Sequence, residues 1–434
     1  MSSLLDGVAP PRLGRPFRWL LAANWATNLA DGFALAAGPL LVASLTTDPR
    51  LVSLAALVEW LPGFVLGLYA GAVADRHDRR RIVVWGNLVR AVALVALTAS
   101  VAIGVVTVTA VIVTLLLVAT AETFIDGASR TVMPMIVPAA DLGIANARMT
   151  FGWVSLNRLV GPPIGAALFA VGAAWPFGAQ TVCFIGGAVL FARIAIPRHT
   201  PQAPASERPR VMADIRAGLR WTWHHRAMRA LVLQIVTFNV TFGASWGVLV
   251  LYASQRLGLD TVGFGLLTTV EAVGSIVGTV TFGRVERHVR LGDVMRYGLV
   301  LETLTHLVLA VTRTPAVAMG ILFLFGIHLA YWATIASSVR QRAVPADLQG
   351  RVGSVYVMAM LGGMVIGNAV GGVLAARWGI TAPYWFAFVG SALILAALWR
   401  ELGHIAHEDA RQLGDHAGPG PAPAPDPAPG TGPG

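Results

Sequence analysis

Twelve long apolar runs, separated by short polar gaps, constrain the fold of this chain more than any other feature. A helix needs about 20 mostly apolar residues to cross a bilayer core of about 30 Å. The first six runs are 19–45, 51–74, 82–104, 106–127, 149–171 and 176–196, and the second six are 228–254, 261–283, 293–312, 315–338, 352–376 and 380–400. These lengths predict an all-α membrane protein with twelve transmembrane helices.

Composition excludes several other classes of protein. Hydrophobic residues make up 56% of the 434 residues and charged residues only 12%, whereas soluble domains carry about 25% charged residues. All 32 basic residues are arginines, and a chain without lysine cannot form the GxxxxGK[ST] loop that binds nucleotide phosphates. The only cysteine, Cys183, cannot form a disulfide within the chain. Since neither clustered metal ligands nor a catalytic triad is evident, we expect no enzyme activity, no metal and no cofactor.

The arginines alternate between gaps, which predicts the orientation of the helices. One set of gaps holds only four: Arg50, Arg256, Arg313 and Arg377. The alternating set holds 26, counting those at the edges of runs: 1–18, 75–81, 128–148, 197–227, 284–292, 339–351 and the tail. Arginine-rich gaps stay in the cytoplasm, so we predict a multi-pass protein of the cell membrane with both termini cytoplasmic. Arginines spread over short gaps form no nucleic-acid-binding face, so no nucleic acid partner is expected.

The two halves of the chain resemble each other. "IVPAADLGIANARM" near residue 141 matches "AVPADLQGRV" near residue 347, and "GPPIGAALFA" at 161 matches "GNAVGGVLAA" at 367. Asp141 and Asp347 are 206 residues apart, as are Gly161 and Gly367. Two matches at one offset indicate an internal repeat. We therefore predict two pseudo-symmetric six-helix bundles, related by an axis along the membrane normal.

The repeat and the longest gap predict the domain boundaries. The N-terminal bundle covers residues 1–196 and the C-terminal bundle covers 228–400. The cytoplasmic linker, 197–227, is rich in proline at first and then contains "VMADIRAGLRWTWHH", in which apolar residues recur every four positions. This spacing predicts an amphipathic helix on the inner membrane surface, with a solvated linker as the alternative. Residues 401–434 are predicted to be a disordered cytoplasmic tail, because its proline-rich and glycine-rich end cannot bury a core.

Four segments resemble the major facilitator superfamily of secondary transporters. They are "NLADGFALAAGPLLV" in the first run, "GAVADRHDRRRIVVWGNLVRA" after the second, "MPMIVPAADLGIANARM" before the fifth, and "NRLVGPPIGAAL" within it. Within the superfamily, the chain is similar to the branch of macrolide-efflux proteins and enterobactin-type siderophore exporters. The resemblance implies two helical bundles that rock against each other and open a central site to one side of the membrane at a time.

The same resemblance implies a function. We expect a secondary active transporter that exports an amphipathic, drug-like small molecule by proton antiport and alternating access. Its expected partners are the small-molecule substrate, protons and the lipid bilayer, and it is expected to act as a monomer. Two alternatives stay open: a dedicated siderophore or natural-product exporter, and a non-transporting membrane receptor or assembly protein with the same fold.

The charged loop after the second run is the most distinctive of these segments. The positions that match the superfamily's loop are Gly71, Asp75, Arg76, Arg79 and Arg80, whereas Asp78 replaces the superfamily's usual glycine. The match implies a latch on the cytoplasmic side. Because Gly71 has no side chain, it lets two helices approach closely. Asp75 would face the positively polarised N-terminal end of the eleventh span, near Arg351.

The arginines of this loop have two possible roles. They can complete the latch by meeting Glu122 or Asp126 at the cytoplasmic end of the fourth span. Alternatively, they only set the topology and contact anionic lipid headgroups. We expect both roles to apply, because a carboxylate such as Asp75 gains nothing from anionic lipid.

Charged residues inside the runs are candidates for proton coupling, because a charge within the bilayer costs several kcal/mol or more. Asp31 in the first span and Arg158 in the fifth lie at comparable depth, so they can pair, either as a coupling site or as a permanent ion pair. Glu59 in the second span lies near mid-depth with no evident cation beside it. A carboxyl group there can carry a proton, or it can face water or neighbouring polar side chains.

The second half offers further candidates in its runs. Glu271 in the eighth span is the candidate for binding a cationic substrate. Glu302 and His306 in the ninth span are four residues apart and share a helix face, but too few other ligands surround them for a zinc site. We interpret His328 in the tenth span as a packing residue.

The fifth run carries a glycine-proline stretch, with Gly161, Pro162 and Gly165 as its candidate residues. Proline bends a helix and glycine permits close packing. We therefore predict that this stretch forms a flexible seam between the two halves.

Overall fold

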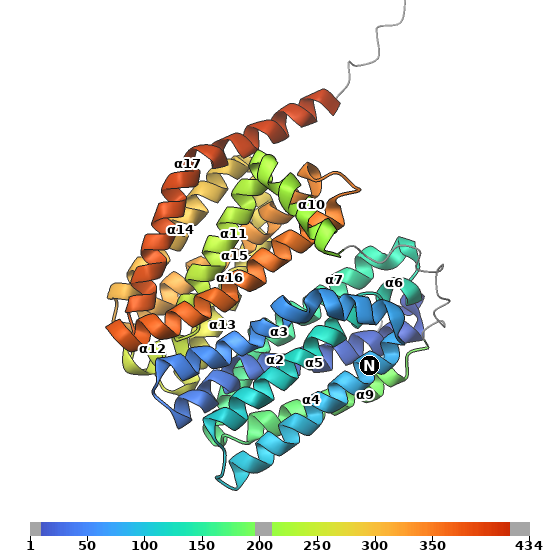
Figure 1. The fold of residues 1–434 in the computed structure, drawn as a ribbon, viewed down its shortest axis with the longest axis vertical. Coiled ribbons are helices and arrows are strands. Elements are labelled where there is room, and N and C mark those ends of the chain that lie inside the picture. Colours follow the sequence, from blue (N-terminus) through green and yellow to red (C-terminus); the bar gives the residue numbers. More distant parts are fainter. Residues whose placement is uncertain (1–9, 196–210, 417–434) are drawn as a thin grey trace, which may run out of the picture.

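The computed structural model describes residues 10–195 and 211–416, which form long helices joined by short connections (Figure 1). In the first half the segments are η1 Pro11–Leu13, α2 Gly14–Leu45, α3 Pro49–Arg76, α4 Arg79–Ala102, α5 Val108–Ser129, α6 Met133–Ile136, η2 Ala139–Asp141, α7 Leu142–Gly152, the π-helical η3 Trp153–Val160, α8 Gly161–Val171 and α9 Trp175–Ala192. In the second half they are α10 Val211–His224, α11 Arg226–Trp246, α12 Leu249–Gln255, α13 Thr261–His288, α14 Leu291–Val311, α15 Pro315–Ala343, α16 Gln349–Trp378 and α17 Ala382–His416.

Within the described ranges, twelve helical segments are long and apolar enough to cross a membrane. Each predicted run overlaps one of them, so the predicted all-α class and the number of spans are confirmed. The fifth span is composite, because it joins η2, α7, η3 and α8 into one apolar segment, Ala139–Val171. The chain is therefore a multi-pass membrane protein.

Short polar side chains define where several spans begin. The Asp78 carboxylate accepts hydrogen bonds from the backbone N–H groups of Arg80, at 2.9 Å, and Arg81, at 3.3 Å. It thereby caps α4, whose first N–H groups have no partner within the helix. Asp260 caps α13 in the same way through Gly263. An aspartate at 78 therefore has a local structural role, although the superfamily's loop usually carries glycine there.

The two halves form two bundles, one built from α2 to α9 and one from α10 to α17 (Figure 1). The repeat of 206 residues reappears in how they pack. A Cβ atom on Gly161 would lie 2.5 Å from the Cα atom of Gly32 on α2, and one on Gly367 would lie 2.9 Å from the carbonyl oxygen of Asn239 on α11. Four residues further along each helix, Gly165 contacts the backbone of Phe33 and Gly371 that of Ala244. The fifth span therefore packs on the first as the eleventh packs on the seventh.

Apolar packing joins the two bundles at one end only. At the end facing the arginine-poor gaps, a single buried cluster includes residues of both bundles, among them Leu41, Val52, Leu251, Phe264 and Ala375. At the arginine-rich end, the buried clusters are separate. One cluster belongs to the second bundle, with Leu231, Leu299 and Val339, and two others belong to the first, with Val83, Ile125 and Phe17 as examples.

Direct contacts between the bundles also occur near the arginine-poor end and in the middle of the helices. Near the arginine-poor end, Gly372 of α16 packs on Ser53 of α3. Near the middle of α3, a Cβ atom on Gly63 would lie 3.6 Å from Leu361 of α16. Towards the arginine-rich end, Tyr69 of α3 is 62% exposed. The bundles therefore meet at one end and diverge towards the other, as the spread of helices in Figure 1 also shows.

Two segments outside the spans differ from, or extend, the sequence predictions. Residues 211–224 do form the helix expected in the linker, α10. Its Gly218 packs on the backbone of Arg351 at the start of α16, while Leu219 and Trp223 are exposed. The predicted disorder began too early, because α17 continues through residues 401–416. This segment, "ELGHIAHEDARQLGDH", contains no proline, and most of its residues favour helix. Residues 417–434 lie outside the described residues.

Candidate functional site

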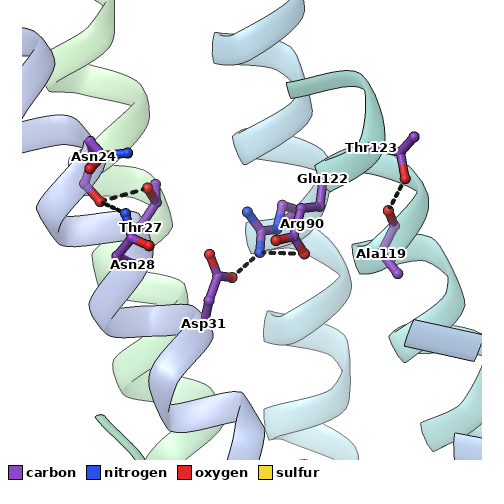
Figure 2. Close-up of polar contacts among 8 residues, drawn as sticks. All are labelled: Asn24, Thr27, Asn28, Asp31, Arg90, Ala119, Glu122 and Thr123. Atoms are coloured by element: carbon purple, nitrogen blue, oxygen red, sulfur yellow. Dashed lines mark hydrogen bonds and ion pairs between the residues drawn. The ribbon is translucent and has the colours of Figure 1, made fainter. Parts of the chain in front are cut away.

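Arg90 is a buried cation in the middle of the first bundle. It lies on α4, and its side chain is only 2% exposed. Its guanidinium group forms an ion pair and hydrogen bond with the Asp31 carboxylate on α2, and lies 3.6 Å from the Glu122 carboxylate on α5 (Figure 2). The face of the guanidinium lies 3.8 Å from the ring centroid of Phe184. Three helices and an aromatic ring thus hold one positive charge.

This network corrects two sequence predictions. Arg158 was considered as a possible partner of Asp31 because of its comparable depth, but the Asp31 carboxylate pairs with Arg90 instead. Glu122 was placed in the cytoplasmic latch, whereas it faces Arg90 inside the bundle. The reason lies in helix packing, since α4 and α5 lie side by side, and α2 and α4 both pack on α9, so that the long Arg90 side chain reaches Asp31 on α2 (Figure 2).

The sequence analysis gave Arg90 no role, although it lies within the third apolar run. Its depth could have identified it. Arg90 is the twelfth residue of α4, counted from the arginine-rich end, and a rise of about 1.5 Å per residue places it about 16 Å into the membrane. An arginine at that depth needs a buried carboxylate, and Asp31 lies at comparable depth.

A second set of charges lies between the bundles. Arg158, on η3, lies within electrostatic range of Glu59 on α3 and of Glu271 on α13, without forming a direct ion pair with either among the described residues. Glu59 and Arg158 are exposed and Glu271 is partly exposed. Glu59 forms no direct ion pair among the described residues, and Arg158 is the cation whose charge acts on it. Because α13 belongs to the second bundle, Arg158 is a charge shared between carboxylates of both bundles.

The local backbone explains why Arg158 can occupy this position. Residues Trp153–Val160 form a π-helix directly before Pro162 and Pro163. Proline has no N–H group, so two carbonyl groups upstream lose their usual helical donors and the helix can widen there. The Arg158 guanidinium carbon lies 5.3 Å from the centre of the Trp153 ring on the same segment, which stabilises the positive charge.

The charges of these two sets, taken together, do not balance. Four carboxylates, Asp31, Glu59, Glu122 and Glu271, accompany two arginines, Arg90 and Arg158. Asp31 is 20% exposed and Glu122 is 42% exposed at their side chains. Accessible carboxylates in excess over arginines can bind protons or a cationic group. No group of three or more metal-ligating side chains that could hold a metal occurs in the described part of the chain.

The arginines of the charged loop contact their own bundle. Arg79 lies 3.8 Å from Asp75 and donates to the Met135 sulfur, Arg80 donates to the Ala192 carbonyl, and Arg81 lies 3.9 Å from Asp78. Arg76 is exposed at the end of α3. None of these contacts involves Glu122 or Asp126, and Asp126 pairs with Arg130 at 3.3 Å.

Asp75 does not contact the eleventh span in this structure. Its side chain is 73% exposed and its ion pair is with Arg79. Gly71 does not mediate the predicted close approach either, because a Cβ atom there would meet no heavy atom within 4 Å. The close contact comes from the other helix, since a Cβ atom on Gly127 of α5 would lie 3.4 Å from the Ala70 backbone.

The glycine-proline stretch of the fifth span has two different faces. Gly161, Gly165 and the π-helical carbonyl groups before them pack on α2 within the same bundle. The opposite side contacts the second bundle, where a Cβ atom on Gly265 of α13 would lie 2.7 Å from Ala166 and 3.7 Å from the Pro162 carbonyl oxygen. The predicted contact between the halves therefore involves Pro162 and Ala166. Gly161 and Gly165 instead pack α8 against α2 within the first bundle.

A third polar group lies inside the second bundle. The Glu302 carboxylate on α14 accepts a hydrogen bond of 3.1 Å from the Ser391 hydroxyl on α17 and lies 3.6 Å from His328 Nε2 on α15. Both ionisable side chains are buried, at 1% and 3% exposure. The interpretation of His328 as a packing residue was therefore wrong, because it faces a buried carboxylate.

Residues 7–419 match a family model described as a transmembrane secretion effector. The macrolide efflux protein A of Streptococcus pyogenes is 22% identical over 81% of this chain and 87% of that protein. The multidrug efflux pump Tap of Mycolicibacterium fortuitum is 24% identical, over 85% and 91%. The enterobactin exporter EntS of Escherichia coli is 23% identical, over 83% and 85%. The crystal structure of a bacterial homologue of the iron transporter ferroportin in an inward-facing state has the same fold, with a TM-score of 0.70 at 17% identity over 89% of this chain and 98% of that one.

Proposed function

Because the chain belongs to the transmembrane secretion effector family, an efflux branch of the major facilitator superfamily, we propose that it exports a cationic, amphipathic small molecule in exchange for protons. The family is one of transporters, and the chain is therefore an efflux transporter rather than an enzyme. The substrate class, the proton coupling and the alternating access are the proposed parts.

The excess of carboxylates over arginines in these two sets of charges carries the proposal. A charge at membrane depth without a partner costs several kcal/mol. The carboxylates that Arg90 and Arg158 do not neutralise therefore favour a bound proton or a bound cation. A proton and a cationic substrate then compete for the same carboxylates. This competition couples export of one to import of the other, because each binding event displaces its competitor.

The roles of the individual residues follow from their contacts. Asp31 and Glu122 compete for Arg90, so protonation of one carboxylate strengthens the pairing of the other. Glu59 and Glu271 share Arg158 across the two bundles, so a cationic group bound between them displaces Arg158 and changes the attraction between the bundles. Asp31, Glu59 and Arg158 thus keep the coupling role predicted for them, and Glu271 keeps the role of substrate contact.

The packing of the bundles supports alternating access. With the arginine-rich end in the cytoplasm, the shared apolar cluster closes the outer end and the separate clusters leave the inner end parted. This arrangement is inward-open. The exposure of Asp75 fits it, because a latch between Asp75 and the start of α16 can form only when the inner ends come together. We propose that Asp75, Arg76, Arg79, Arg80 and Arg351 make that latch in the outward-open state.

Everted membrane vesicles test the proposal. Respiration acidifies their lumen, and a lipophilic cation such as tetraphenylphosphonium should enter the lumen in exchange for protons and make it more alkaline. Glu122→Gln should abolish this response. Asp126→Asn is the comparison on the same helix and should retain most of the response, since Asp126 is exposed and its ion pair is with Arg130 rather than Arg90. A full response from Glu122→Gln, or none from the parent protein with any amphipathic cation in a panel, would contradict proton antiport.

The similarity to an enterobactin exporter supports one alternative class of substrate. A dedicated siderophore or natural-product exporter would respond to one compound and ignore lipophilic cations. A growth-inhibition panel of macrolides, lipophilic cations and siderophores, comparing a deletion strain with an overexpressing strain, separates the two proposals.

The orientation can be tested with the same cells. Ile103 is 72% exposed at the arginine-poor end, and His77 is exposed at the arginine-rich end. On a background with Cys183→Ser, a membrane-impermeant maleimide applied to intact cells should label Ile103→Cys and leave His77→Cys unlabelled. The reverse pattern would place both termini outside the cell.

A further inference from the structure

Glu302 and His328 form a pair of ionisable groups that the proposed transport site does not use. They lie in the second bundle, on α14 and α15, whereas the network around Arg90 lies in the first. Both side chains are almost fully buried, with the Glu302 and His328 groups 3.6 Å apart. Ser391 binds one carboxylate oxygen, and the other faces the imidazole.

The electrostatics of burial determine how many protons this pair holds. A neutral imidazole beside a protonated carboxyl group has no net charge, and neither does an imidazolium beside a carboxylate. Each of these states contains one titrating proton. Two such protons or none would leave a net charge inside the bundle, which is costly without a partner. The state with one proton, shared by both groups, is therefore the stable state of the pair, and release of that proton leaves a net charge inside the bundle.

A third ionisable group lies one helical turn away. His306 is on the same helix four residues beyond Glu302, about 6 Å nearer the outer end, and is 0% exposed. Neither of its ring nitrogens has a hydrogen-bond partner among the described residues. Buried polar atoms usually have one. Burial disfavours a protonated His306 and the charge of Glu302 favours it, so His306 can accept a proton while Glu302 is ionised.

The neighbouring helices offer few competing groups. α14 packs against α15 and α17. On α15, the other ionisable residue of the membrane core is Tyr331, whose hydroxyl bonds to Thr281. On α17, the ionisable residue within Ala382–Trp399 is Tyr384, near the outer end. On α13, which packs against α15, Glu271 interacts with Arg158 instead.

We propose that Glu302 and His328 are a proton-binding site of the C-terminal bundle, with His306 as the acceptor that connects it towards the outer end. The site binds and releases one proton without contacting the exported molecule, because its side chains are sealed from the space between the bundles. When the proton is lost or moves to His306, the charge between α14, α15 and α17 changes, and the packing of these three helices changes with it.

Infrared difference spectroscopy of the purified full-length protein in lipid nanodiscs tests this site without any substrate. Spectra recorded while the pH is varied should contain the signal of a buried carboxyl group losing its proton. Glu302→Gln should remove that signal, whereas Thr305→Val should retain it. Thr305 is the matched control, because it is fully buried on the same helix and bonds only its own helix carbonyl. Identical spectra from the parent protein and Glu302→Gln would overturn the proposal.

Two further variants distinguish this site from the network around Arg90 and from a structural role. Ser391→Ala removes a hydrogen bond but no ionisable group, so it should move the midpoint of the signal without removing it. Asp31→Asn should leave the signal unchanged, even if Asp31→Asn stops export. A carboxyl signal that is lost in Asp31→Asn and kept in Glu302→Gln would assign the titrating proton to the first bundle alone. That result would contradict this inference. Failure of proton antiport in vesicles would leave the spectroscopic result intact.

Discussion

The two bundles share their packing and differ in their charges. Gly161 fastens the fifth span to the first, and Gly367, 206 residues later, fastens the eleventh to the seventh through the same kind of backbone contact. The polar groups have no such correspondence. The first bundle holds an arginine between two partly exposed carboxylates, and the second holds a sealed glutamate-histidine pair.

This difference shows that a repeat can preserve a scaffold while its two copies acquire different chemistry. Helix packing depends on small residues at a few contact points, and these recur at the same offset. Charges within the membrane depend on which side chains can reach a partner and on whether water or substrate can reach them. An accessible carboxylate can bind a substrate, whereas a sealed one can exchange only a proton.

The largest effect is expected from removing the central cation. Arg90→Leu leaves the partly exposed carboxylates of Asp31 and Glu122 without the buried cation between them, which should destabilise the protein by about 2–3 kcal/mol and abolish export. Thermal unfolding in detergent and the vesicle assay measure both effects. A stable and active Arg90→Leu protein would mean that the first bundle does not need its charge, and that the contrast between the bundles is not functional.

Glycine substitutions test the shared packing. Gly161→Ala and Gly367→Ala should each lower the free energy of unfolding by about 1–3 kcal/mol, because the added methyl group meets backbone atoms that cannot move aside. Gly71→Ala is the matched control, since a Cβ atom there has open space, and should have little effect. If only one of the first two variants is destabilised, the packing of the fifth span on the first is not equivalent to that of the eleventh on the seventh.

The contrast between accessible and sealed carboxylates predicts different effects on substrate affinity. Glu271→Gln should weaken binding of tetraphenylphosphonium about tenfold, equivalent to about 1.4 kcal/mol. Glu302→Gln should leave this affinity unchanged, because Glu302 is 1% exposed. Equilibrium binding to purified protein measures both values. Equal losses in the two variants would show that Glu302 reaches the substrate after all.

The smallest effect on stability is expected at the charged loop. Asp75→Asn removes an exposed ion pair with Arg79, and such pairs contribute about 0–1 kcal/mol. The melting temperature should therefore change little, while export should decrease because the outward-open latch is lost. Unchanged export at normal expression would confine the loop to setting topology.

The sequence by itself determined the twelve spans, the helical class and the repeat, because these follow from local hydropathy and from spacing along the chain. It also identified Asp31, Glu59, Arg158 and Glu271 as residues worth testing, since a charge inside an apolar run is visible in one dimension. Even the start of α4 at Asp78 follows from local capping chemistry.

Only the tertiary structure decided which charges meet. Asp31 had two arginines available at similar depth, and depth alone could not choose between Arg90 and Arg158. The choice depends on which faces of α2, α4 and η3 are turned towards one another, and this is set by close backbone contacts such as that between Gly32 and Gly161. The same rotation turned Glu122 inward and brought His328 against Glu302. Partners of charges in a helical bundle follow from helix rotation and packing, which a linear pattern does not contain.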